Sequence, residues 1–557
     1  MKLRVTYAKR SYKDKVYVTP LVQYSYRDEK GVPRHKTLLS LAKLPDYLVK
    51  VIDEALKRGE NSVIDDLFPE AGIQYQFSVG IGAAYVAWAV LAQLAVTTLL
   101  KKYLTEVKAL AVTAFIIERM IAEKPLSIVA QRRQFDGSPI HYVLGSPPTP
   151  SLNGWYQSFA ELEKVRDKIL EDLYARKSNT DKVFLYDITS SYFEGDMCPL
   201  AEYGYNRDGK NGKKQVVIGV ICDAEGRPIW CDVFKGNTPD QTTVRQQLLH
   251  LKETLGVQEF IFVGDRGMVT NARIEELEEE GWWESFNYIT ALKRKELMML
   301  IDDQDHPMQT DLFDHENLSE IEYQGERFVL CHNPYKLEED RMVRERLLCK
   351  TEEKLQRIDN AVKAGRLKQQ DKIAKRLYRW LNHWSMERFF RVSYSDGYFS
   401  FERNEEEIER FIAIDGCYVI RSNVDRETFT SEDLQRQYKD LKYVEQAFRT
   451  MKTTNINLRP IRVWKEEHVR GYIFACFLAY LATWEIRKRL QPILAGAADK
   501  TSDGISLQEV YRSVANVSVG VFELNGKSHS ALSTISKKNR ELFKLLKLPE
   551  ITASLNQ

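Results

Sequence analysis

The chain has 557 residues, of which 81 are Lys or Arg and 79 are Asp or Glu, so its formal net charge is only +2. This balance excludes a protein that binds nucleic acid through its overall charge, and charge has to be judged segment by segment. Hydrophobic residues make up 43% of the chain and aromatic residues 11%, which excludes a disordered protein. The length predicts two to four domains.

The cysteines and the apolar segments restrict the class further. The seven cysteines are scattered without CxxC spacing, a pattern typical of reduced thiols in a cytosolic protein and not of a zinc knuckle or a disulfide framework. The opening residues, MKLRVTYAKR, lack the apolar core of a signal peptide. Two apolar runs, residues 71–100 and 471–483, are expected to be buried helices because the first is rich in Ala, Thr and Gly and the second is short.

The first 150 residues are expected to form a small β part followed by helices. Residues 14–45 alternate between apolar and polar side chains and predict two strands around a turn at residues 28–31. Residues 45–130 carry apolar side chains at three- and four-residue steps, which indicates helices. A segment rich in Gly, Pro and Ser follows, and residues 155–177 predict one amphipathic helix.

From residue 182 the pattern changes to strands. The segments KVFLYD, KQVVIGVICD and RPIWCDVFKG predict three strands with short connections. A helix over residues 240–255, the strand EFIFVGDRG, a helix over residues 271–281 and the strand FNYITAL follow in that order. The order β-β-β-α-β-α-β predicts an α/β protein with a ribonuclease-H-like mixed sheet.

Two aspartates follow apolar strand segments of this region. Asp187 comes directly after Phe-Leu-Tyr, at the expected end of a buried strand. Burial of an unpaired carboxylate costs several kcal/mol, so this acid either caps a turn, faces solvent, is paired or holds a metal. Asp265 comes just past the fourth strand, at the carboxyl edge where open α/β sheets place their sites.

A third acid, Glu445, lies in a segment that predicts a single long helix over residues 432–453, because it contains no Pro or Gly. At about 100° per residue, Tyr438, Glu445 and Lys452 fall on one narrow stripe of that helix. A charge on the inner stripe of an amphipathic helix favours a site, whereas a solvated face with Glu–Lys pairs is the commoner alternative.

The motifs YDITSSYFEG, GNTPDQTT and VGDRGMVTN, followed by the Tyr438–Leu441–Glu445–Lys452 spacing, resemble in content and order the DDE transposases of bacterial insertion sequences. They are most similar to the group with a Tyr-Arg-Glu-Lys signature. The likeness extends over roughly residues 180–485. Leu441 stands where that signature has Arg, and nearby Lys442 or Arg449 could replace the missing cation.

The resemblance implies a domain organisation. A DNA-binding region over residues 1–150 would precede a catalytic domain made of residues 151–292 and 430–490. A large insertion domain would cover residues 293–429, and a helical region over residues 491–557 is a candidate for dimerisation.

The resemblance also implies a set of site residues. Asp187, Asp265 and Glu445 would hold two Mg²⁺ ions, with Mn²⁺ as a substitute. The DNA-contacting residues would be Tyr438, Lys452, Lys442, Arg449, Trp380 and Trp384. The two tryptophans belong to a basic part of the insertion, where base stacking and core packing are alternative roles. The loop Asp208–Lys214 is expected to be an exposed hairpin turn, with DNA contact as an alternative.

The function implied is a transposase that cuts transposon ends and joins them to target DNA. Its partners would be double-stranded DNA, both terminal inverted repeats and target, and a second copy of the chain on that DNA; no membrane is expected. We expect a cytoplasmic, nucleoid-associated protein. Two alternatives remain open: a ribonuclease-H-like nuclease without a joining step, and an inactive transposon-derived DNA-binding protein, for which Leu441 is the sequence hint.

Overall fold

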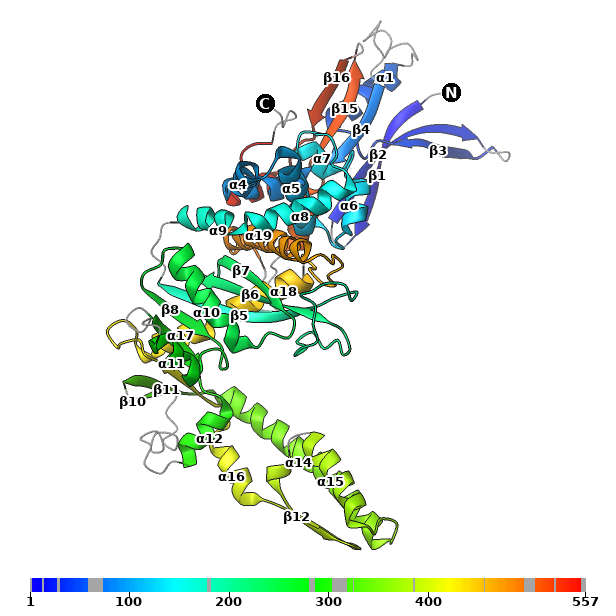
Figure 1. The fold of residues 1–557 in the computed structure, drawn as a ribbon. Coiled ribbons are helices and arrows are strands. Elements are labelled where there is room, and N and C mark those ends of the chain that lie inside the picture. Colours follow the sequence, from blue (N-terminus) through cyan, green and yellow to red (C-terminus); the bar gives the residue numbers. More distant parts are fainter. Residues whose placement is uncertain are drawn as a thin grey trace.

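The computed structural model describes residues 3–12, 15–27, 31–58, 74–177, 182–279, 286–302, 318–323, 325–383, 386–454, 456–494, 506–524 and 527–551. Figure 1 shows an elongated molecule in three parts. The two ends of the chain lie together in one part, a large sheet with its helices lies in the middle, and an arm of helices and a hairpin extends from the far side.

The N-terminal part is a three-stranded antiparallel sheet with one helix on it, formed by β1 (Leu3–Tyr12), β2 (Lys15–Arg27), β3 (Pro33–Ser40) and α1 (Asp46–Arg58). The predicted pair of strands corresponds to β2 and β3, and β1 adds a third strand on the other side of β2. Val5, Val22, Leu41 and Val49 form a small core that is separate from the rest of the molecule.

A second small sheet joins the two ends of the chain. β4 (Gln74–Gly80) pairs with β15 (Ser518–Leu524), which also pairs with β16 (Lys527–Leu532). The region 491–557 is therefore not only helical, although α20 (Leu507–Val514) and α21 (Lys537–Leu545) flank the hairpin. The strand β15 buries Val519 and Val521, and its partner β4 comes from the other end of the chain.

A layer of helices lies between these sheets and the large central sheet (Figure 1). Its members are α3 (Gly82–Gln93), α4 (Val96–Tyr103), α5 (Glu106–Ile121), α6 (Ile128–Gln134), α7 (Pro139–Val143), α8 (Leu152–Lys164) and α9 (Arg166–Ala175). The single helix predicted over residues 155–177 is wrong, because the chain breaks at Val165. Arg166, which begins α9, ion-pairs at 2.8 Å with the buried Asp232 of the sheet, a tertiary contact that local periodicity does not encode.

The helix α19 (Glu466–Leu490) packs against α5, α8 and the central sheet, and it connects the helical layer to that sheet. By length and composition it could cross a bilayer, and so could α3 and α4 taken as one bent pair. However, 83% of the apolar window of α19 is buried inside the molecule. That burial is the pattern of a core helix, which the sequence predicted for residues 471–483.

The central sheet has eight strands in the order β10-β11-β14-β9-β8-β5-β6-β7. Its first five strands along the chain are β5 (Val183–Tyr192), β6 (Gln215–Asp223), β7 (Pro228–Lys235), β8 (Phe260–Gly264) and β9 (Phe286–Ala291). The strands β5, β6 and β7 are antiparallel neighbours, whereas β8 runs parallel to β5 and β9 parallel to β8. The helices α10 (Asp240–Leu249), continued by the π-helical turn η1 (His250–Thr254), and α11 (Asn271–Glu279) connect them. This mixed sheet confirms the predicted ribonuclease-H-like fold.

Three further strands extend this sheet at one edge. They are β10 (Leu318–Tyr323), β11 (Glu326–His332) and β14 (Cys417–Ser422), and β14 pairs with β9. All three fall within residues 293–429, so the segment assigned to the insertion contributes three strands to the central sheet, and the same segment also contains the helix α12 (Arg294–Asp302).

The insertion outside the sheet is the arm in Figure 1. It consists of α14 (Pro334–Lys363), α15 (Gln370–His383), the 3-10 turn η3 (Glu387–Phe389), β12 (Phe390–Ser395), β13 (Tyr398–Arg403) and α16 (Glu405–Ala413). Leu348, Leu355, Ile373 and Leu377 belong to a second core cluster, which also includes Phe328, Leu330 and Val419 of the strands β11 and β14. The core of the arm is therefore continuous with the edge of the central sheet.

Candidate active site

The register of β5 and β8 places the first two acids side by side. The last parallel pair joins Tyr186 to Gly264, and the residues that follow are Asp187 and Asp265. The prediction that Asp187 ends its strand is wrong, because β5 continues to Tyr192. The strand pairs with β8 only as far as Tyr186, but it pairs with β6 along its whole length. Asp187 thus lies at the position along β5 where β8 ends and its pairing with β5 stops.

The third acid comes from α18 (Lys442–Arg449), which packs against β5 and β6. The single helix predicted over residues 432–453 is wrong. The segment forms α17 (Ser431–Lys439), a turn, α18 and a π-helical turn, η4 (Thr450–Thr454). The buried Leu441 and Thr450 stand at the two breaks. Since no Pro or Gly lies at these breaks, low helix propensity does not explain them, and we attribute them to packing against the sheet.

Asp187 lies in a concentration of negative charge. Burial raises the pKa of its carboxyl to about 7, and the charges of Asp265 and Glu445 act in the same direction. The Ile188 backbone N–H, which donates to Asp187 Oδ1 at 2.7 Å, and the charge of Arg207 oppose this rise in pKa. Asp187 therefore lies close enough to both Asp265 and Glu445 for their charges to act on it.

Tyr438, on α17, holds Asp265. Its hydroxyl donates to Asp265 Oδ1 at 3.2 Å, and the Arg266 backbone N–H donates to the same oxygen at 2.7 Å. The Tyr438 ring stacks on Tyr418 of β14, with centroids 6.2 Å apart. Burial and the Asp265 charge raise the pKa of Tyr438 to about 12, so its hydroxyl stays a neutral donor at neutral pH.

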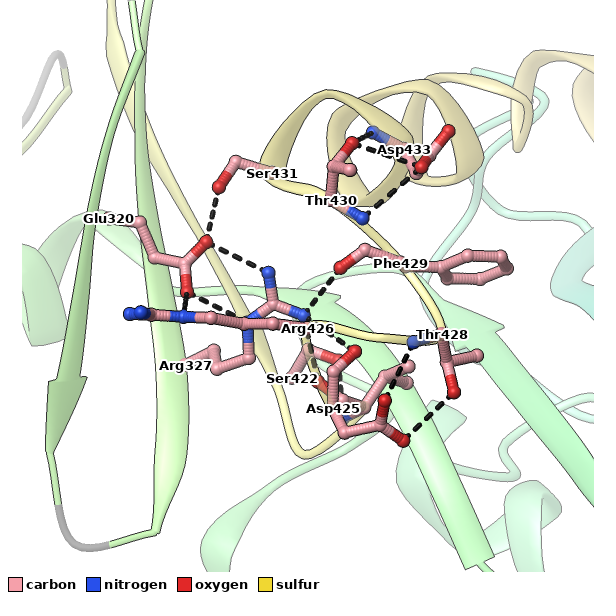
Figure 2. A network of polar contacts seen from close by, with 11 residues as sticks. Glu320, Arg327, Ser422, Asp425, Arg426, Thr428, Phe429, Thr430, Ser431 and Asp433 are labelled. Atoms are coloured by element: carbon pink, nitrogen blue, oxygen red, sulfur yellow. Dashed lines mark hydrogen bonds and ion pairs between the residues drawn. The ribbon is translucent and has the colours of Figure 1, made fainter.

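A polar network fixes the start of α17, as Figure 2 shows. Glu320 of β10 accepts from Arg327 Nε at 2.9 Å, from Arg327 Nη2 at 2.8 Å and from Arg426 Nε at 2.7 Å, and the hydroxyl of Ser431 also donates to it. Arg327 Nη1 donates to the carbonyl oxygens of Val424, Asp425 and Phe429. The hydrogen bonds from Arg327 lower the pKa of Glu320 to about 2.

The same network leads directly into the cap of the helix. Thr430 and Asp433 form a capping box, in which the Asp433 N–H donates to the Thr430 hydroxyl at 3.2 Å. The edge strands β10 and β11 thereby position the helix that carries Tyr438. Sequence reasoning missed this network, although the T-x-x-D spacing ahead of the helix was a readable signal.

Lys452 makes a different contact from the one predicted for it. Its Nζ lies 2.9 Å from Asp208 Oδ1, Arg459 Nη1 contacts the same oxygen, and the Tyr192 N–H donates to Asp208 Oδ2 at 3.0 Å. The side chains of Lys452 and Asp208 are only 10% and 2% exposed. Asp208 begins a loop that was expected to be exposed, and sequence reasoning missed its role as an anchor.

The other residues predicted to bind DNA are distributed over two places. Lys442 is exposed on α18 and ion-pairs with Asp440 at 3.1 Å, and Arg449 is exposed on the same helix. Trp380 lies on the arm, partly buried against its core, with Lys354 Nζ 4.7 Å from the ring centroid. Trp384 lies outside the described residues. DNA contact by these residues stays a prediction, and the packing of Trp380 favours the alternative role in the core.

The three acids fit a hard divalent cation by their chemistry, because carboxylate oxygens are the ligands that Mg²⁺ and Mn²⁺ prefer. A cation among them would also offset the burial and the neighbouring negative charges that raise the pKa of Asp187. In the described part of the chain, no three His, Cys, Asp or Glu side chains are close enough to share one metal ion in this conformation.

Comparison with known proteins identifies the family. Residues 179–482 match the family model described as the transposase DDE domain. No curated protein sequence matches the chain. Among solved structures, the piggyBac transposase synaptic complex with hairpin DNA matches at 9% identity and a TM-score of 0.33, over 78% of this chain and 76% of that chain.

The Mos1 mariner paired-end complex with Mn matches at 22% identity and a TM-score of 0.13, over 22% of this chain and 41% of that chain. A pre-cleavage Mos1 transpososome matches at 17% identity and a TM-score of 0.14, over 29% and 54%. The chain thus spans about half the length of the Mos1 chains it matches. Since the family model covers more than half of the chain and contains Asp187, Asp265 and Glu445, the chain belongs to the transposase DDE domain family.

Proposed function

We propose that this protein is a transposase of the insertion-sequence type, which cuts DNA at transposon ends and joins those ends to target DNA. The observation that carries the proposal is the convergence of Asp187, Asp265 and Glu445, all within the family match, at the point where β8 leaves β5. Three carboxylates gathered at one end of a strand pair are typical of a cation site for phosphoryl transfer.

Asp187, Asp265 and Glu445 would hold Mg²⁺, with Mn²⁺ as a substitute. Bound metal supplies a Lewis acid that favours deprotonation of the attacking hydroxyl and stabilises charge on the leaving oxygen. In each step a water or 3′-hydroxyl oxygen forms a bond to phosphorus as the P–O3′ bond of the cut strand breaks, so no protein nucleophile is required. Tyr438 and the Arg266 N–H orient Asp265 through one oxygen, which leaves the other oxygen for a cation.

The DNA partner would be a duplex that carries terminal inverted repeats, together with a target duplex. Lys442 and Arg449, exposed on the helix of Glu445, are placed to contact phosphates beside the cut strand. We propose that residues 1–150 recognise the repeat, because the catalytic sheet has to accept any target sequence. Two ends must be cut and joined together, so the DNA-bound form would be at least a dimer.

A strand-transfer assay with Mg²⁺ tests the proposal, with the DNA that flanks the gene as the source of paired ends. Joined product supports a transposase. Degradation that does not depend on ends would instead show a nuclease without a joining step, and binding without cleavage would show an inactive DNA-binding protein. The matched control is Glu432→Gln, an exposed acid on α17, which should keep wild-type activity.

A further inference from the structure

A cavity of about 390 Å³ lies where the helical layer meets the segment that follows η4. Its walls come from the end of α5, the α5–α6 connection, α8, α19 and residues 457–463. Four of its lining residues are basic, namely Arg119, Lys124, Arg459 and Arg462. No Asp or Glu is among the described residues that line it, so the cavity is suited to an anion.

Arg119 is built into the wall of the cavity, because its side chain is only 6% exposed. Its Nη1 and Nη2 donate to the carbonyls of Ile456, Asn457 and Leu126 at the long distances of 3.3–3.4 Å. Its Nε makes no hydrogen bond, although it ion-pairs with Glu118 Oε2 at the long distance of 3.7 Å. The buried guanidinium therefore keeps donor capacity for a ligand oxygen.

The segment 457–463 ties this cavity to the catalytic sheet. Ile461 forms a β-bridge with Phe193, just beyond the end of β5, and its carbonyl accepts from the Glu194 N–H at 3.0 Å. Arg459, which lines the cavity, also contacts Asp208, the partner of Lys452. One wall of the cavity is thus a segment that is hydrogen-bonded beside the end of the strand that carries Asp187.

The surface continues past the cavity with an aromatic side chain and a cation. Trp464 is 55% exposed, and Lys465 Nζ lies 5.6 Å from its ring centroid. A row of cations followed by an exposed aromatic ring is suited to a nucleic-acid backbone, which extends beyond one phosphate.

We propose that this cavity binds the phosphodiester backbone of double-stranded DNA at a second contact, apart from the acids. The proposal rests on the proposed function, since DNA is the anion that a transposase has to hold while the acids act. A free phosphate ion has the same charge chemistry as one backbone phosphate, and the continuation to Trp464 and Lys465 favours the polymer.

The test uses the full chain with Lys124→Ala and Arg462→Ala, two exposed cations of the cavity. Affinity for a labelled duplex of random sequence is measured over a range of salt concentrations. Each variant should bind severalfold more weakly and should reduce the slope of log K against log salt by about 0.9, the loss of one phosphate contact. The matched control is Lys168→Ala, an exposed lysine of α9 outside the cavity lining, which should leave the slope unchanged.

Wild-type slopes in both cavity variants would overturn the proposal. A second measurement follows the thermal unfolding of the wild type and of both variants in the presence of inorganic phosphate. Stabilisation of the wild type that is lost in the variants, combined with unchanged DNA slopes, would assign the cavity to a free anion and would also overturn it. If the cavity variants reduce the slope but the wild type never cleaves DNA, the cavity contact stands and the proposed function is rejected. If the wild type cleaves DNA but the cavity variants leave the slope unchanged, only the cavity contact is rejected.

Discussion

Two shielded aspartates of the transposase DDE domain, Asp187 and Asp208, have opposite surroundings. Asp187 faces Asp265 and Glu445, and burial together with these negative charges raises the pKa of its carboxyl to about 7. Asp208 faces Lys452 and Arg459 and also accepts the Tyr192 N–H. The comparison teaches that burial alone does not define a site. Asp187 lies beside two further carboxylates that repel its charge, whereas Asp208 is already paired with two cations.

The two aspartates should therefore affect stability in opposite directions. Arg207 offsets the desolvation of an ionised Asp187 only in part, because the pKa of its carboxyl still rises to about 7, so its charge destabilises the metal-free fold. Asp208 neutralises two cations that would otherwise be shielded without a partner, and its loss should destabilise the fold. The following substitutions test this contrast.

The largest effect is expected on catalysis. Asp187→Ala, Asp265→Ala and Glu445→Ala should each lower the rate of DNA cleavage by more than about 10⁴-fold, because each removes a ligand from the metal site. DNA affinity should stay near the wild-type value, since none of the three removes a cation. Single-turnover cleavage and binding measured on the same DNA check both parts, with Glu432→Ala as the control. Near-normal cleavage by any one of the three variants would remove that acid from the site.

Asp208→Asn should cost about 3–5 kcal/mol of stability, because it leaves Lys452, with a side chain only 10% exposed, without its anion. The control is Asp172→Asn, which breaks the more exposed ion pair with Lys102 and should cost less than about 1 kcal/mol. Thermal unfolding at neutral pH measures both variants. Equal losses at the two positions would show that Asp208 is no more than a surface partner.

Leu441→Arg should destabilise the fold by roughly 2–3 kcal/mol, because Leu441 is buried in the core between α17 and α18. Cleavage should not increase, since Lys442 and Arg449 already present cations on the neighbouring helix. Lys442→Ala or Arg449→Ala should in turn weaken DNA binding by about 1–3 kcal/mol. A faster Leu441→Arg enzyme, with no loss in the two alanine variants, would show that the chain lacks a contact that its relatives have.

The smallest effect is a gain in stability. The pKa of Asp187 rises from 3.8 to about 7 on folding, so between these values the folded state binds more protons and stability falls as pH increases. Asp187→Asn, which has no charge to bury, should therefore raise stability by about 1–2 kcal/mol at pH 8 without divalent cations, after allowance for relaxation. At pH 4 the two proteins should unfold at nearly the same temperature. A loss at pH 8 would contradict the assigned surroundings of Asp187.

The strands β5 to β9 of the central sheet could be predicted from the sequence, because they are apolar runs separated by polar turns, whereas β10, β11 and β14 were assigned to the insertion. The acids Asp187 and Asp265 were readable for the same reason, since a carboxylate directly after an apolar run is unusual. The continuation of β5 to Tyr192 was not readable, because it depends on β6 remaining paired after β8 has left.

The other features could not be predicted from the sequence, because they depend on contacts between distant segments of the chain. The breaks around α18 have no Pro or Gly to mark them and follow from burial of Leu441 and Thr450. Asp208 looked exposed because it lies in a polar, Gly-rich loop, and its partner Lys452 comes 244 residues later. The pairing of β4 with β15 joins segments from the two ends of the chain, and no local pattern in either strand identifies the other.

The most direct test of the central claim is a Mn²⁺ titration of the full chain at pH 8, followed by electron paramagnetic resonance. The wild type should bind Mn²⁺ saturably, and Asp265→Asn and Glu445→Gln should each weaken that binding by at least about tenfold, through loss of a carboxylate ligand. Asp172→Asn, whose acid lies on α9, should bind like the wild type. Unchanged Mn²⁺ affinity in both Asp265→Asn and Glu445→Gln would contradict a metal site formed by these acids.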